Sequence, residues 1–191
     1  MGGFSIGASH HTEPESVAEA LRHAALMYSS MANLDKLDTV EDSDAPTQEE
    51  TNKRFATEVR DGVIKNRPEL EKNFNRAAVL LDGGEPVRFG YLSSRAVMHF
   101  GVLHPVRQSA SVRDARARLW ELLRAKNYAT IGNAALIVAT PRTDDPTLGG
   151  KQIEAINRNV REIEREAKDT DMIFHPVTSV TEAVGHVMQL A

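Results

Sequence analysis

The run Ala-Ala-Leu-Ile-Val-Ala-Thr at residues 134–140 is the part of the sequence that decides the fold class. Its seven residues carry no charge, and the β-branched residues Ile137 and Val138 lie at its centre. An uninterrupted apolar run of this length is typical of a strand that is buried on both faces of a sheet. We therefore expect a central strand here.

Helical patterns lie on both sides of this run. Residues 111–127 and 150–168 repeat apolar side chains at helical spacing, and residues 172–178 and 180–190 predict a last strand and a last helix. Ser111 and Asp114 have the spacing of a capping-type start for the first of these helices. The C-terminal half of the chain therefore alternates strands and helices, as α/β proteins do.

Three shorter strands are expected before the first of these helices, over residues 77–81, 87–91 and 96–103. The turn Asp82-Gly83-Gly84 joins the first two, and glycine there accepts the positive φ that a tight hairpin needs. In the third strand, alternation predicts Met98, Phe100 and Val102 on one face and Val97, His99 and Gly101 on the other.

The predicted order is therefore βββαβαβα over residues 75–191. We expect an α/β domain with a mixed five-stranded sheet, an antiparallel meander plus two parallel strands, covered by helices on both faces. In element order alone this resembles the ribonuclease H-like fold. Residues 47–140 also resemble the order of the restriction-endonuclease-like core, but the second and third strands lack the acidic residues of that site.

Residues 1–74 are expected to form an N-terminal helical segment. Thr12 or Glu13 caps an amphipathic helix that has Pro14 in its first turn, and residues 35–50 are expected to form an acidic linker. Thr47 and Glu50 then form a capping box that opens a further helix. If the first helix packs on its own chain it completes the core, and if it packs on another copy it makes a dimer.

Composition excludes several classes of protein. The 191 residues contain no cysteine, which removes disulfides, thiolate metal sites and cysteine nucleophiles. We find no apolar run long enough for a membrane span and no signal peptide, so a cytoplasmic location is expected. The net charge of −4 is segregated: residues 1–50 have ten acidic and two basic residues, whereas residues 51–126 have eight acidic and fifteen basic residues.

Carboxylates permit one catalytic hypothesis, a metal-dependent nuclease or phosphotransfer enzyme that uses Mg²⁺ or Mn²⁺. Such chemistry needs several acidic side chains that converge on the ions. The candidates are Asp82, Glu121, Asp144 and Asp145. A hairpin turn, a solvated helix face and a loop turn explain these residues better than catalysis does.

Basic residues permit a second hypothesis, binding of a polyanion such as a nucleic acid. The candidates are Arg107, Arg113, Arg116, Arg118, Arg124 and Lys126. A separate anion site is conceivable at a helix start, where Gly149, Gly150 and Lys151 could present free N–H groups. The seven histidines show no metal-ligand spacing on any helix.

The sequence favours a non-catalytic binding or assembly protein, such as a subunit, adaptor or inhibitor in a larger complex. No resident cofactor is expected, and a protein partner or a second copy is the expected partner. The metal-dependent enzyme and a nucleic-acid-binding module without catalysis are the alternatives.

Overall fold

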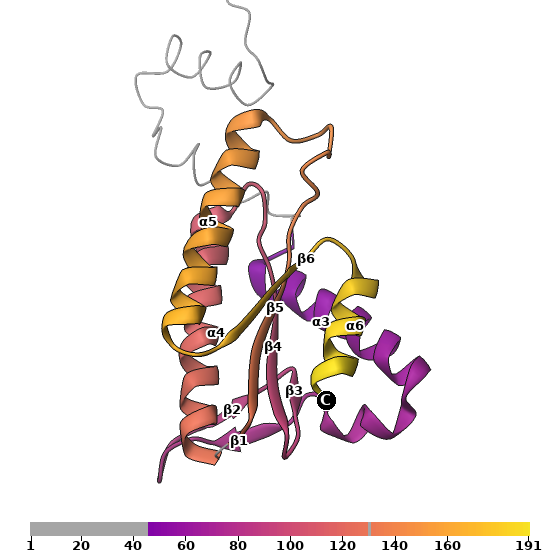
Figure 1. Cartoon of the computed structure of the whole chain (residues 1–191), viewed down its shortest axis with the longest axis vertical. Helices are drawn as coiled ribbons and strands as arrows, with labels where there is room; N and C mark the ends of the chain where they lie inside the picture. Colours follow the sequence, from indigo (N-terminus) through magenta and orange to yellow (C-terminus); the bar gives the residue numbers. More distant parts are fainter. Residues whose placement is uncertain (1–45, 130) are drawn as a thin grey trace, which may run out of the picture. The chain divides into compact units, whose positions relative to one another are not determined.

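The computed structural model describes residues 46–129 and 131–191, which belong to one compact unit from Pro46 to Ala191 (Figure 1). The described helices are α3 (Gln48–Asn66), the 3-10 helix η1 (Pro68–Asn73), α4 (Gln108–Ala129), α5 (Gly150–Asp169) and α6 (Val180–Leu190). The strands are β1 (Ala77–Val79), β2 (Pro86–Arg88), β3 (Tyr91–Leu92), β4 (Ala96–Val102), β5 (Asn133–Ala139) and β6 (Ile173–Val177). The protein is thus a mixed α/β protein. No helix in the described ranges has the length and apolarity needed to cross a membrane.

The main sheet has four strands in the order β3-β4-β5-β6. β3 is antiparallel to β4, and β4, β5 and β6 are parallel, with His99 opposite Leu136 and Ile137 opposite His175. Both parallel connections run through helices, α4 and then α5. The central position of β5 agrees with the charge-free run that predicted it, because strands β4 and β6 flank it on both sides.

The expected single five-stranded sheet is wrong. β1 pairs only with β2, in a separate two-stranded antiparallel sheet, and the hairpin turn between them has Gly83 at a φ of 75°. The predicted strand 87–91 is split at Gly90, where the chain bends and an added Cβ would clash with the Phe100 ring. Only Tyr91 and Leu92 pair with β4 in the main sheet. The ribonuclease H-like resemblance, which assumed five strands in one sheet, is not supported.

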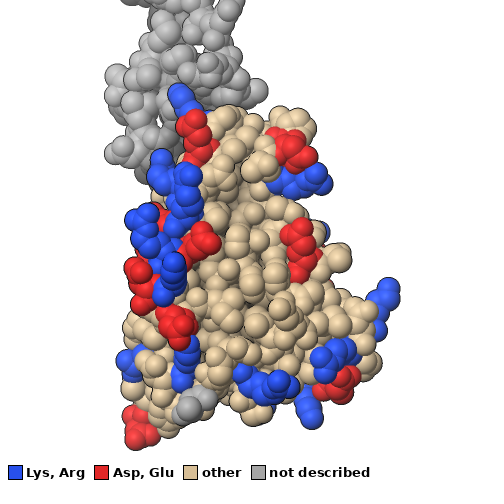
Figure 2. Space-filling model, in the orientation of Figure 1, with Lys and Arg blue, Asp and Glu red and all other residues tan. Residues whose placement is uncertain are grey.

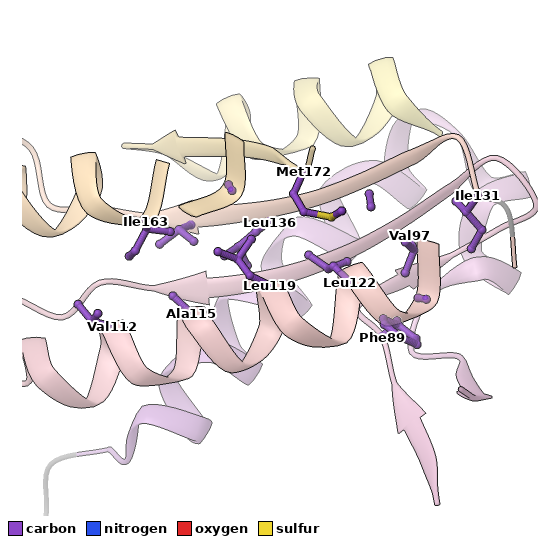
Figure 3. Packing of buried hydrophobic residues seen from close by; sticks show 14 of the residues in the cluster. Phe89, Val97, Val112, Ala115, Leu119, Leu122, Ile131, Leu136, Ile163 and Met172 are labelled. Carbon is purple, nitrogen blue, oxygen red and sulfur yellow. The ribbon is translucent and has the colours of Figure 1, made fainter. Parts of the chain in front are cut away.

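Helices cover both faces of the main sheet, α4 and α5 on one side and α3 and α6 on the other (Figure 1). Crossover connections of the same handedness that advance across a sheet in the same direction place their helices on the same face of the sheet. The connections through α4 and α5 are of this kind. The predicted alternation of β4 is confirmed. Met98 and Phe100 belong to the core beneath α3 and α6, and Val97 belongs to the core beneath α4 and α5, where Figure 3 shows it near Leu122 and Phe89.

α3 packs on the sheet through Phe55, Val59 and Val63, all of them buried. The predicted capping box of Thr47 and Glu50 is present at its start. The boundary expected between residues 74 and 75 therefore falls inside the compact unit, which begins at Pro46. The amphipathic helix after Pro14 and most of the acidic linker lie outside the described residues.

α4 begins at Gln108, three residues before the predicted start at Ser111. Nδ1 of His104 accepts the N–H groups of Val106 and Arg107, at 3.2 Å each, so the chain turns into the helix earlier. Ser111 and Asp114 consequently lie inside the helix and face other side chains. Their partners define the candidate site.

Candidate functional site

A chain of hydrogen-bonded polar side chains joins the start of α3 to the start of α4. Nε2 of Gln48 donates to the Val102 carbonyl at 2.8 Å and to Oδ1 of Asn52 at 2.9 Å. The same Oδ1 accepts the Val102 N–H at 2.9 Å, and Oγ of Ser111 donates to Oε1 of Gln48 at 2.8 Å. Both helices are thereby fixed to the last residue of β4. Asn52 and Ser111 are almost fully buried, and buried polar groups of this kind are costly unless paired.

The chain continues along α4 to His99 in the middle of β4. Nδ2 of Asn52 donates to Oδ2 of Asp114 at 2.8 Å, and Nε of Arg118 lies 3.4 Å from the same oxygen. Nη1 of Arg118 lies 3.2 Å from Nδ1 of His99. Because a guanidinium can only donate, Nδ1 is the acceptor, and the proton of the neutral ring is on Nε2.

His99 is a neutral side chain with an imperfectly satisfied nitrogen. Burial lowers its pKa, and the charge of Arg118 acts in the same direction. The contact with Glu121 and the charge of Asp114 act to raise the pKa but do not outweigh burial. Nε2 lies 2.8 Å from Oε2 of Glu121, but its N–H bond is not aligned for a hydrogen bond with that oxygen. Burial acts to raise the pKa of Glu121, whereas contact with the His99 ring and the charge of Arg118 lower it and outweigh burial. Glu121 is therefore ionised beside a neutral imidazole.

A cleft of about 460 Å³ opens over this polar chain. α3, β4 and α4 form part of its wall, and the segment around β2 forms the rest. Three cationic side chains reach the lining, Lys53, Arg88 and Arg118, against one carboxylate, Glu49. Other lining residues are Asn52, Ala56, Thr57, Asn75, Phe89, Gly90, His99 and Phe100. A cleft with this excess of cations is suited to an anionic ligand.

Sequence reasoning missed most of this site. His99 was read only as a strand residue, and Ser111 with Asp114 only as a helix cap. A signal was present in α4, where Ser111, Asp114, Arg118 and Glu121 follow one another at intervals of three, four and three residues, beside the apolar stripe. Polar residues that share a helix face next to a buried stripe indicate a polar interface. Their partners on α3 and β4, however, lie 19 to 63 residues away in sequence.

The carboxylates of the metal hypothesis do not come together. Asp82 lies in the β1–β2 turn, at the opposite end of the main sheet from the loop after β5 that holds Asp144 and Asp145 (Figure 1). Asp144 pairs with Arg142 at 2.8 Å, and Oδ1 of Asp145 accepts the N–H and hydroxyl of Thr147. Within residues 46–129 and 131–191, no three His, Asp or Glu side chains are placed to hold a metal ion.

Most of the polyanion candidates already have protein partners. Arg116 pairs with Glu162 and Glu166 on α5, and Lys126 pairs with Asp171 at 2.7 Å. Nη1 of Arg107 donates to the Pro46 carbonyl, and Arg118 belongs to the buried polar chain. Arg124 lies over the Trp120 ring. Of the six candidates, Arg107, Arg113 and Arg124 make no ion pair with a described residue, and of these three Arg107 is hydrogen-bonded to a backbone carbonyl.

The predicted anion site at Gly149, Gly150 and Lys151 does coincide with a helix start, because Gly149 is the N-cap of α5. The Gly149 N–H already donates to Oε1 of Gln152 at 3.0 Å. A hollow of about 570 Å³ lies at the carboxyl ends of β5 and β6, but none of these three residues lines it. Its charged lining residues are Arg142, Asp144 and Glu182, and the first two are paired with each other.

Comparison with known proteins identifies no relative. No protein family, no curated protein and no solved structure matches this chain. The geometry of the cleft is therefore the main ground for a functional proposal.

Proposed function

We propose that this chain is a binding protein whose cleft beside α3 holds a small anionic ligand, through a carboxylate or phosphate group, without covalent chemistry. The observation that carries the proposal is the set of three cations at one cleft, Lys53, Arg88 and Arg118, with a single carboxylate among them. The cleft volume of about 460 Å³ is in the range that small-molecule sites occupy.

Two of these cations are available to a ligand. Arg88 donates through Nη1 to the Asn75 carbonyl at 3.2 Å, and neither Arg88 nor Lys53 forms an ion pair with a described residue. A charged hydrogen bond to a bound anion is stronger than a neutral one, and a bidentate guanidinium contact adds specificity. Arg118 is held in place by Asp114 and His99, so it costs little side-chain entropy on binding.

Binding is favoured over catalysis because the general-base candidate of the cleft is occupied on both sides. Nδ1 of His99 faces Arg118, and Nε2 faces Glu121. A general base must reach the proton that it removes with a free acceptor nitrogen. His99 therefore supports the cleft wall. The cleft is bounded by α3, the β2 segment and α4. A ligand that bridges these elements is compatible with a role of this chain as a subunit, adaptor or inhibitor. The protein partner and the cytoplasmic location expected from the sequence remain proposals.

The test is a titration of the full chain with inorganic phosphate and, separately, with citrate, followed by calorimetry and by thermal unfolding. A ligand that binds only the folded protein raises its stability by about 2.7 kcal/mol at one hundred times Kd. We expect one of the two anions to bind. Lys53→Ala and Arg88→Ala should each weaken that binding about tenfold, the value of one charged hydrogen bond.

The matched control is Arg54→Ala. Arg54 neighbours Lys53 on α3, does not line the cleft, and pairs with Glu58 at 3.1 Å. This variant should bind like the unchanged protein. If neither anion binds, or if the Lys53 and Arg88 variants bind as well as the Arg54 variant, the proposal is wrong.

A further inference from the structure

The outer face of α4 carries four side chains that we call the aromatic stripe: Arg113, Trp120, Arg124 and Tyr128. At 100° per residue they lie within about 80° of one another around the helix, on the side away from the buried residues Leu119 and Leu122. Trp120 is 55% exposed and Tyr128 is 58% exposed. Only 5% of the residues are aromatic, so two large rings left in water on one helix face need an explanation.

Arg124 and Trp120 are already arranged as a unit. The guanidinium carbon of Arg124 lies 5.0 Å from the centroid of the Trp120 ring, in cation–π contact. The contact holds the guanidinium beside the ring, and its N–H groups make no hydrogen bond or ion pair with a described residue. One face of the Trp120 ring is thus turned to a cation, while the residue remains 55% exposed.

The charge of the stripe is positive, without a carboxylate among its members. The acidic residues near α4 are on its two flanks. On one flank Arg116 pairs with Glu162 and Glu166, and Figure 2 shows such mixed charges in a column along the edge where α4 and α5 lie. On the other flank Glu121 contacts His99. The stripe itself therefore presents the cations Arg113 and Arg124 to an incoming anion, and the carboxylates lie beside it.

We propose that the aromatic stripe binds single-stranded nucleic acid, with bases stacked on Trp120 and Tyr128 and phosphates held by Arg113 and Arg124. Aromatic rings interleaved with cations are the general means of holding a single strand, because every base has a face that stacks and every linkage carries a charge. The two rings are eight residues apart, about 12 Å along the helix. A duplex is disfavoured because its bases stack on one another. This inference is independent of the anionic ligand in the cleft.

The experiment uses the fluorescence of Trp120, which is the single tryptophan of the chain. The full chain is titrated with a twelve-residue oligothymidylate and a twelve-residue oligouridylate, at low and at moderate salt. We expect quenching of the Trp120 emission and an affinity that falls steeply with salt. Tyr128→Ala should weaken binding about tenfold or more, and Arg124→Ala should weaken it and reduce the salt dependence by about one ion.

Arg116→Ala is the matched control, because Arg116 lies on the same helix but is paired with α5. It should bind like the unchanged protein. Arg116 and Tyr128 are exposed and Arg124 is half-buried, and far-ultraviolet circular dichroism checks that all three variants fold. Absence of quenching with both oligonucleotides at low salt would overturn the proposal and assign the stripe to a protein partner. Equal binding of a twelve-base-pair duplex, or no effect of Tyr128→Ala, would also overturn it.

Discussion

Asn52→Ala is the substitution that most directly tests the buried polar chain. Asn52 is 4% exposed, and its amide makes three contacts at 2.8–2.9 Å, to Gln48, to the Val102 N–H and to Asp114. Alanine removes all three contacts while it keeps the helical backbone of α3. The loss in free energy of unfolding then depends on the polar groups that lose Asn52 as a partner.

The Val102 N–H loses the side-chain acceptor that it has in the folded protein, and a buried donor without a partner costs about 1–3 kcal/mol. Asp114 loses an amide donor but keeps Arg118, and its side chain is 28% exposed, so water replaces part of the loss at a cost of about 1 kcal/mol. Alanine has the higher helix propensity and returns about 0.5 kcal/mol. The net loss is about 1.5–3.5 kcal/mol, which corresponds to a decrease in Tm of about 3–14 °C at this chain length.

The assay is urea unfolding of the full chain, together with amide hydrogen exchange of Val102. Asp61→Ala is the control, because Asp61 is exposed on the same helix; its effect should stay within about 0.5 kcal/mol. Protection of the Val102 amide should fall only in the Asn52 variant. A loss below about 1 kcal/mol, or unchanged protection of Val102, would refute the view that Asn52 fixes α3 to the end of β4.

Three further outcomes follow from the packing and the charges. Gly62→Ala should destabilise the protein by about 1–3 kcal/mol in thermal unfolding, because the new Cβ would lie 2.6 Å from Cγ2 of Val184. Adding Val184→Ala to the same chain should recover part of that loss. An unchanged or raised Tm for the single variant would contradict the close contact between α3 and α6. Burial lowers the pKa of both His99 and His175, with nearby positive charge contributing, so the unfolded chain binds more protons than the folded chain below about pH 6.5. Stability should therefore be full above that pH and fall as the pH is lowered from about 7 to about 5. A urea midpoint that is constant over this range would argue against buried neutral histidines. Arg116→Ala should cost no more than about 1 kcal/mol in urea unfolding, because its pairs with α5 are half exposed, and a loss of several kcal/mol would show that these pairs hold the helices together.

Local patterns predicted much of the architecture. The charge-free run of β5, the alternation of β4 and the capping box at Thr47 each depend on residues that are close in sequence, and each is present in the structure. The five-stranded sheet failed at one position. Gly90 lies against the Phe100 ring, at the bend that separates β2 from β3. No local propensity of Gly90 reveals a contact with a residue ten positions away.

The sequence by itself determined the fold class, the helix stripes and the burial of the central strand, because these follow from hydrophobic periodicity along a short segment. Only the tertiary structure decided which basic residues are free and which polar residues meet. Arg116 and Arg124 look alike in sequence, yet one is paired across to α5 and the other lies over Trp120. Asn52 and Asp114 are 62 residues apart and are joined by a 2.8 Å hydrogen bond. Charge pairing and buried hydrogen bonding depend on distances of a few ångströms, and such distances are set when the layers pack.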